Sequence, residues 1–113
     1  MERIDQYRKI IHCLLEDYVQ FYSAMSDPGV DTDIISDDVH GEYLLMRVGW
    51  RGETRVRRPL FYLRLRNDKI WIEEDWTKEG IVTELMAAGV PNEDIVLAFN
   101  PPELRELTEF AVA

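Results

Sequence analysis

The sequence predicts an α+β fold in which a long N-terminal helix packs on a four-stranded antiparallel sheet, with short C-terminal helices. The first observation is an unbroken spacing of three or four between apolar residues from Ile4 to Met25, which is the period of an α-helix. The second is a series of stretches after Val30 in which polar and apolar residues alternate, and short polar breaks separate one stretch from the next. Breaks this short favour antiparallel strands, because parallel strands need long crossover connections.

Length, composition and cysteine content limit the classes of protein to which the chain can belong. The 113 residues, 46 % hydrophobic and 31 % charged, fit one domain covering residues 1–113. The single cysteine, Cys13, cannot form an internal disulfide, which favours a reducing compartment. Residues 1–26 lack the pattern of a secretion leader, and no uncharged apolar stretch approaches the ~18 residues of a membrane span. We therefore expect a cytoplasmic protein that does not span a membrane.

The predicted N-terminal helix covers Glu2–Ser23 and is followed by a turn signal at residues 27–29. Its apolar stripe consists of Ile4, Tyr7, Ile11, Leu14, Tyr18, Phe21 and Met25. Neighbouring apolar residues widen this stripe beyond a coiled-coil seam, which predicts packing on a sheet first and on a partner helix second. A homodimer is compatible with this pattern, and Ile4, Tyr7 and Ile11 are candidate contacts in it.

The strands are expected at Asp31–Ser36, Tyr43–Trp50, Arg55–Arg66 and Lys69–Glu74. Gly52 and the pair Asn67-Asp68 suit tight hairpin turns between them. Pro59 lacks the amide proton that a strand ladder needs, so we expect a bulge or an edge position there. Trp50 is assigned to the core, whereas Trp71 and Trp76 are candidate interface residues.

Beyond the sheet, the sequence predicts short helices and one ambiguous segment. Thr77 is placed as the cap of a helix that ends at Gly89. Ile95–Phe99 is too short for a long helix, and its β-branched residues favour a strand. A short helix from Pro101 to Leu107 follows, and the apolar ending Phe110–Ala113 is expected to dock on the body.

The formal charge of −9 is distributed unevenly along the chain. Residues 51–69 carry seven basic and two acidic side chains, although the whole chain has 13 basic and 22 acidic ones. Arginine pairs with phosphate and aromatic rings stack on bases, so this stretch is a candidate nucleic-acid surface. Its candidate contacts are Arg55, Arg57, Arg58, Arg64 and Arg66. Arginines that alternate with apolar residues are also typical of a half-exposed strand neutralised by acidic neighbours, and we favour this second interpretation.

Two groups of polar residues have the composition of a catalytic or metal site. His40 with Asp38 could act as a general base, but a solvated turn between strands has the same composition. Glu73 and Asp75 at a strand end could hold a metal ion, although no lysine follows at nuclease-like spacing. Cys13 has no neighbour in sequence that would activate it. We therefore expect no catalytic residue, no metal and no cofactor.

Stretches along nearly the whole chain match the pattern of one protein family. In the N-terminal part they are Asp5–Ile11, Tyr43–Trp50 and Lys69–Ile72. In the C-terminal part they are Gly80-Ile81, Glu84-Leu85, Ala88–Pro91, Glu93–Leu97, Pro101–Glu103 and Thr108–Val112. Together these stretches resemble the XisI family, the fdxN element excision controlling factors.

The resemblance implies a non-enzymatic accessory factor in the cytoplasm of a cyanobacterium. Such a factor acts with a companion called XisH, so that a separate recombinase can excise a DNA element during heterocyst differentiation. XisH-like proteins resemble restriction-type nucleases. We hypothesise that carboxylates of this acidic chain occupy the basic DNA-binding surface of such a partner. Two alternatives stay open, namely direct DNA binding by the basic hairpin and a small enzyme that uses His40 with Asp38.

Overall fold

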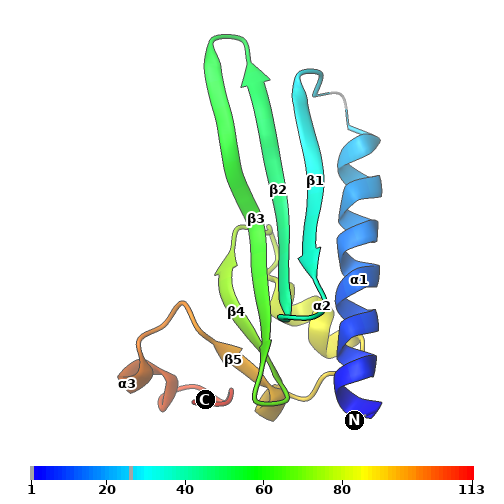
Figure 1. Ribbon diagram of the computed structural model, residues 1–113. Coiled ribbons are helices and arrows are strands. Elements are labelled where there is room, and N and C mark those ends of the chain that lie inside the picture. The colour runs from blue at the N-terminus through cyan, green and yellow to red at the C-terminus, as the bar shows by residue number, and fades with distance from the viewer. Residues whose placement is uncertain (1, 26) are drawn as a thin grey trace.

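The computed structural model describes residues 2–25 and 27–113 and has the predicted α+β class (Figure 1). Its elements are α1 (Glu2–Ser23), β1 (Val30–Asp37), β2 (Glu42–Arg51), β3 (Thr54–Arg66), β4 (Lys69–Asp75), α2 (Ile81–Ala87), η1 (Asn92–Asp94), β5 (Ile95–Leu97) and α3 (Pro102–Arg105). The bounds of α1 are those predicted, and each of the four predicted strands ends within one residue of its expected position. Among the described residues, none of the helices is both long enough and apolar enough to cross a lipid bilayer.

The sheet has five strands and is mixed, which corrects the prediction of a four-stranded antiparallel sheet. The strand order is β1-β2-β3-β4-β5, and the first four strands are antiparallel neighbours. β5 pairs with β4 in parallel, with Ile95 opposite Ile70. The connection through α2 allows β5 to run parallel to β4, because it brings the chain back to the end of the sheet at which β4 begins. Ala111 makes a parallel bridge to Val96, so the predicted docking of the chain end is confirmed.

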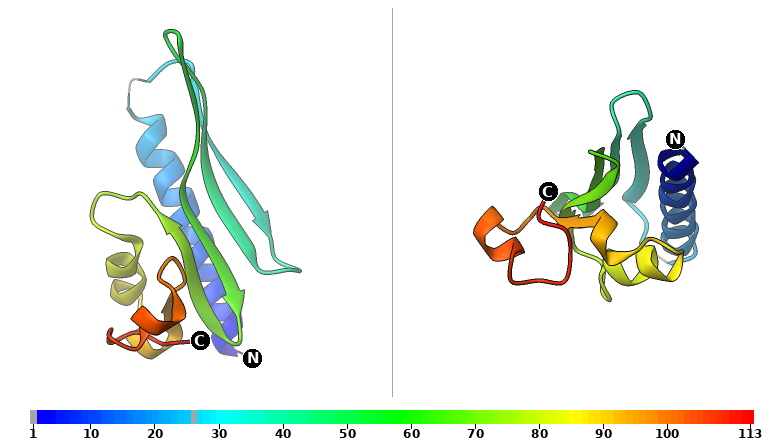
Figure 2. Two further views of the ribbon diagram at one scale, coloured as in Figure 1. Left: turned by 90° about the vertical axis from the view of Figure 1, so that its left-hand side faces the viewer. Right: turned by 90° about the horizontal axis from the view of Figure 1, so that it is seen from below.

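One face of the sheet, here called the inner face, carries the core, and α1 and α2 cover it (Figure 2). Tyr43, Leu45 and Leu63 point from the strands into this core and are fully buried. Ile11 and Leu15 of α1 are equally buried against them. Each such side chain contributes roughly 1.5–3 kcal/mol to folding through the apolar surface that it removes from water.

The burial of α1 corrects the prediction of a dimer contact along its stripe. Tyr7 and Ile11 are core residues of this chain, and Ile4 is partly buried against the same core. At the other end of the stripe, Phe21 is 60 % exposed and Met25 is 50 % exposed. The stripe therefore packs inside the chain over most of its length and reaches solvent only at its C-terminal end.

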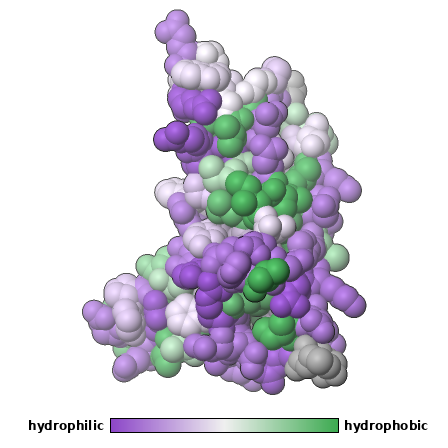
Figure 3. Space-filling model, viewed as in Figure 1, coloured by the Kyte–Doolittle hydropathy of each residue, from purple (hydrophilic) through white to green (hydrophobic). Residues whose placement is uncertain are grey.

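The opposite face of the sheet, here called the open face, carries an apolar patch over β1 and β2 (Figure 3). Met46 and Val48 lie half-buried on it, and Trp50 is 53 % exposed. The assignment of Trp50 to the core is therefore wrong. Side chains of a strand alternate between faces, and the packing of Leu45 and Arg47 on the inner face sends Trp50 to the other one.

The irregular features of β3 follow the predicted local chemistry. Leu45 pairs with Phe61 and Met46 with Pro59, so Leu60 is the extra residue of a bulge beside the proline. Asn67 and Asp68 both have positive φ angles, 54° and 61°, which is the conformation of a type I′ hairpin turn. The bulge and this turn are confirmed.

The start of α2 differs from the prediction, because Asp75 rather than Thr77 satisfies its first amides. One carboxylate oxygen of Asp75 accepts from the backbone N–H of Thr77 at 2.9 Å, and the other accepts from that of Ile81 at 2.8 Å. The hydroxyl of Thr77 donates to the same carboxylate and is not available as a cap. The helix therefore begins at Ile81, later than a cap at Thr77 would place it.

Tyrosine–carboxylate hydrogen bonds join the layers around the core. The Tyr7 hydroxyl donates to the buried Asp94, and the Tyr18 hydroxyl donates to Glu84 of α2. Tyr43 donates to Asp38 in the β1–β2 turn at 2.7 Å. Burial, followed by the hydrogen bond to a carboxylate, raises the pKa of Tyr7 and that of Tyr43 to about 12.

Arg47 provides a second buried polar link, between β2 and the end of α1. Its guanidinium donates to Asp27 and to the hydroxyl of Thr32, the latter at 3.0 Å. It also lies 4.6 Å from the ring centroid of Tyr22, within the range of a cation–π contact. Removal of Asp27 would leave this buried charge without its carboxylate, which is costly in a folded protein.

The packing of α1 predicts a strong position dependence for leucine substitutions. Leu15→Ala should lower the free energy of unfolding by about 2–5 kcal/mol, because it empties a fully buried site. Leu107→Ala is the matched control: this side chain is 81 % exposed, and its loss should change stability by less than about 0.5 kcal/mol. Urea unfolding followed by circular dichroism measures both. Equal effects of the two substitutions would contradict the assignment of the core.

The raised tyrosine pKa values predict a loss of stability in alkaline solution. A phenol whose folded pKa exceeds its unfolded value of 10.0 stabilises the fold fully below pH 10, and this contribution disappears as the pH rises towards 12. Tyr7→Phe should therefore be less stable at pH 8 but should show a shallower fall between pH 10 and 12. Unfolding measured across this range, with absorbance at 295 nm to follow ionisation, gives the two slopes. Parallel slopes would show that Tyr7 does not titrate with unfolding.

Candidate functional site

The five candidate nucleic-acid contacts fall into two groups along β3. In the lower part of the strand, Arg64 and Arg66 form ion pairs with Glu42, the former at 3.3 Å. Arg66 also donates to the carbonyl of His40 at 2.8 Å. Burial alone would raise the pKa of Glu42, but hydrogen bonds from Tyr62 and Arg66 hold it below its ordinary value. Arg64 and Arg66 are therefore engaged within the sheet, as expected for a half-exposed strand.

The upper group lies on the β2–β3 hairpin, which projects beyond the end of α1 (Figure 1). Arg55, Arg57 and Arg58 are exposed, and none of them forms an ion pair with another described residue. Arg55 lies 5.3 Å from the ring of Trp50, and Arg58 lies 5.7 Å from the ring of Trp76. The neighbouring Arg51 differs, since Asp27 binds it at 2.8 Å. The hairpin thus presents three uncompensated positive charges beside two exposed aromatic rings.

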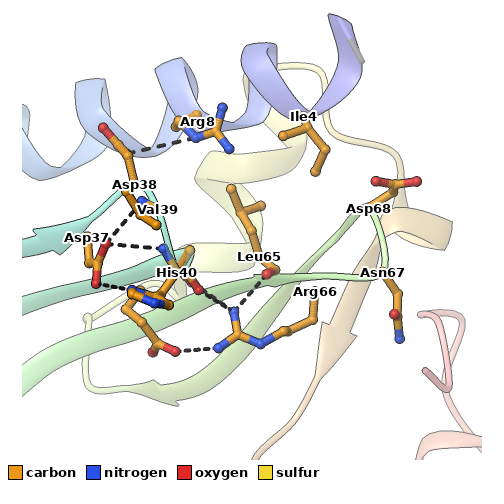
Figure 4. Close-up of a pocket in the computed structure, with 12 residues that line it drawn as sticks. Ile4, Arg8, Asp37, Asp38, Val39, His40, Leu65, Arg66, Asn67 and Asp68 are labelled. Carbon is orange, nitrogen blue, oxygen red and sulfur yellow. Dashed lines mark hydrogen bonds and ion pairs between the residues drawn. The ribbon is translucent and has the colours of Figure 1, made fainter.

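The candidate general base lies in the β1–β2 turn, beside a hollow of about 740 Å³ (Figure 4). His40 does not pair with Asp38, the residue considered with it in the enzyme alternative. Its Nδ1 lies 2.7 Å from Asp37, whereas Asp38 turns towards α1 and lies 2.9 Å from Nε2 of His12. The hydrogen bonds to these histidines hold the pKa of each aspartate below its ordinary value. The pairing of His40 with Asp38 that the enzyme alternative requires is therefore not formed, and each of the two aspartates has a different histidine as its partner.

The carboxylates at the end of β4 also have separate partners. Glu73 lies 3.7 Å from Arg64, and Glu74 accepts from the indole N–H of Trp76 at 2.6 Å. Asp75 accepts from the amide of Thr77, which precedes α2, and from that of Ile81, the first residue of α2. In the part of the chain that the structure describes, no three histidine, cysteine or acidic side chains come together as metal ligands would.

The two tryptophans considered as candidate interface residues have different surroundings. Trp71 is half-buried: its indole N–H donates to the carbonyl of Arg66 at 3.0 Å, and Arg105 lies 5.5 Å from its ring. Trp76 is 58 % exposed and borders a small hollow with Phe99. Trp71 is therefore held within the chain, while Trp76 offers an aromatic surface.

The structure also forms a hollow that the sequence analysis did not identify, between the C-terminal half of α1 and the start of α2. Its volume is about 510 Å³. Its apolar and aromatic lining comes from Tyr18, Phe21, Tyr22 and Met25, and its polar lining from Asp17, Lys78, Glu79, Thr83 and Glu84. We call it the α1–α2 hollow.

The rings of the α1–α2 hollow are held by contacts inside the chain. Tyr18 packs edge-on to the buried Phe61 at 5.5 Å and stacks on Tyr22 at 6.5 Å. Its hydroxyl donates to Glu84, and burial followed by this bond raises its pKa well above the ordinary value. Phe21 meets Tyr22 edge-on at 5.2 Å and leaves most of its surface to solvent. A fixed aromatic floor with an exposed apolar side chain is a form suited to binding another molecule.

The charge around the hollow is mainly acidic, since among the described residues three carboxylates line it and Lys78 is the one basic side chain. The sequence does contain one indication of the hollow. The apolar stripe of α1 continues to Met25, whereas the apolar stretch of the following helix is only a few residues long. A short second helix cannot cover the whole stripe, so an apolar end of α1 is left over.

Comparisons with known proteins agree with this structure. A family model described as XisI protein matches residues 1–112. The crystal structure of a XisI-like protein from Anabaena variabilis is 33 % identical, with a TM-score of 0.89, and the match covers 97 % of this chain and 99 % of that one. The structure of the fdxN element excision controlling factor XisI from the same organism is 40 % identical, with a TM-score of 0.82 and coverage of 98 % and 99 %. No curated protein gives a significant match.

Proposed function

The chain belongs to the XisI family, and from this premise we propose that it is a non-enzymatic accessory factor that controls excision of a DNA element. The relative that is 40 % identical over nearly the whole chain bears the name of an excision controlling factor. The side chains considered for catalysis have structural roles: Asp37 and Asp38 hold the β1–β2 turn, and Asp75 holds the start of α2. A role on chromosomal DNA would place the protein in the cytoplasm of its cell.

The proposed mode of action is a protein–protein contact with an XisH-like partner. The observation that carries it is the α1–α2 hollow, where the exposed ring of Phe21 lies among carboxylates of an acidic chain. A basic surface with one protruding apolar side chain fits this chemistry, because the apolar group can bury against Phe21 and Met25 while the rim charges steer the encounter. The carboxylates would in this way compete with DNA for the basic surface of the partner.

Substitutions in the hollow test this contact. Asp17→Lys combined with Phe21→Ala should weaken binding of a purified XisH-like partner by about tenfold or more, since it removes both an apolar anchor and a rim charge. Glu16→Lys is the matched control, because Glu16 is exposed on the same helix but does not line the hollow. Isothermal titration calorimetry in moderate salt gives the affinities, and gel filtration at micromolar concentration shows the complex.

Two results would contradict the proposal. One is the failure of the two unmodified proteins to co-elute. The other is an equal loss of affinity in Glu16→Lys and in the hollow variant, which would indicate a general charge effect rather than a site.

Direct binding of DNA is the second candidate, favoured by the uncompensated Arg55, Arg57 and Arg58 beside Trp50 and Trp76. Phosphate contacts would pair with the guanidinium groups, and the rings could stack on unpaired bases. The net charge of −9 opposes this binding at long range. The hairpin would therefore have to act at short range, where its own charges dominate.

Salt dependence distinguishes this candidate. If the hairpin binds DNA, the triple substitution of Arg55, Arg57 and Arg58 by Ala should lower the affinity and reduce the slope of log K against log salt by about 3. Arg64→Ala serves as the control, because Glu42 and Glu73 already neutralise that side chain. Fluorescence anisotropy with a labelled oligonucleotide measures the slopes. An absence of binding even at low salt would remove direct DNA binding from consideration.

A further inference from the structure

The open face of the sheet carries an ordered pattern of charge across three strands. The pairing of the strands sets rows of side chains on this face, and one row contains Asp31 of β1, Val48 of β2 and Arg57 of β3. The next row contains Asp33, Met46 and Pro59. The first row therefore runs from acidic on β1 through apolar on β2 to basic on β3, and the second row is acidic on β1 and apolar on β2 and β3.

No other element of the described chain covers this pattern, because α1 and α2 lie on the inner face (Figure 2). Ile35, which belongs to the same face at the lower end of β1, is 54 % exposed. Asp31 and Arg57 are both exposed and form no ion pair with each other. Their backbones stand two strand spacings apart, about 9–10 Å, with Val48 between them, and both side chains point away from the same face rather than towards each other.

We propose that this open face binds a second copy of the chain, open face to open face, about a two-fold axis that runs parallel to β2. Rotation by half a turn about this axis leaves each row at the same position along β2 and exchanges its β1 end with its β3 end. Val48 then lies over its own counterpart, and Asp31 of each copy lies over Arg57 of the other. Face-to-face sheets pack about 10 Å apart, so side chains from the two faces can interdigitate and these charges can meet across the gap.

The order of the charges singles out a second copy as the occupant. A symmetric dimer requires a surface that is complementary to itself, and the acid–apolar–base order of the row from Asp31 to Arg57 fulfils this condition with no change in either chain. DNA would meet Asp31 and Asp33 on the same face and would be repelled there. A partner of one charge sign would match only one edge of the apolar strip and oppose the other.

The proposed dimer leaves the α1–α2 hollow free, because that hollow lies on the side of the helices. The dimer does not depend on the proposed function, and the two can fail independently. It does compete with DNA for the hairpin, since Arg57 would be paired with a carboxylate of the second copy.

Charge reversal with complementation tests the arrangement. The unmodified chain, of 13.3 kDa, should have the mass of a dimer at micromolar concentration by light scattering and sedimentation. Arg57→Asp should weaken the dimer at least about 100-fold, because the symmetry creates two carboxylate–carboxylate contacts, and Asp31→Arg should do the same through two contacts between arginines. An equimolar mixture of the two variants should form a heterodimer, in which one reversed pair and one original pair are both attractive.

Lys9→Asp is the matched control, since it makes the same change of charge at an exposed position on α1. It should leave the dimer intact, and circular dichroism should show all variants folded. A monomeric unmodified chain at 100 micromolar or so would overturn the proposal. Dimers that persist in both single variants would place the interface elsewhere and overturn it as well. Single variants that stay monomeric when mixed would show that Asp31 and Arg57 do not face each other.

Discussion

The packing of α1 against one face of the sheet is the contact on which the rest of the structure depends. It buries Ile11 and Leu15 against Tyr43 and Leu45, which assigns one set of alternate strand residues to the core. The other set of alternate residues must then lie on the open face, because neighbouring side chains on a strand point in opposite directions. Trp50 reaches solvent for this reason. The C-terminal end of α1 extends beyond α2. The packing of α1 on the sheet therefore accounts for both the open face and the α1–α2 hollow.

The charges of the molecule are sorted by the sheet into paired and unpaired groups. In its lower half, Glu42 holds Arg64 and Arg66 on neighbouring strands. At the end of α1, Asp27 holds the buried Arg47 and the exposed Arg51. The upper arginines of β3 have no such neighbour, because β1 is two strands away and β4 ends below them. The chain therefore has a net charge of −9 and a locally basic hairpin. The net charge alone does not describe the charge of the surface that a partner would contact.

The surfaces available for binding lie on different sides of the molecule. The α1–α2 hollow combines acidic and apolar side chains on the helical side, whereas the open face carries a row of acidic, apolar and basic side chains across β1, β2 and β3. The proposed dimer through the open face would therefore present two copies of the α1–α2 hollow to a binding partner. The residues first considered for catalysis contribute to neither surface, since Asp37, Asp38 and Asp75 hold turns and a helix start.

The sequence by itself determined the features that depend on near neighbours in the chain. These are the bounds of α1, the four antiparallel strands, the turn at Asn67-Asp68 and the bulge beside Pro59, since backbone period, glycine and proline chemistry act over a few residues. Only the tertiary structure decided the parallel β5, the inner face of β2, the partners of Arg64 and Arg66, and the hollow around Tyr18. Each of these depends on a contact between distant residues, as Tyr18 with Glu84 illustrates across 66 positions. Local periodicity says which residues share a face, but only the packing of layers says which face meets the core.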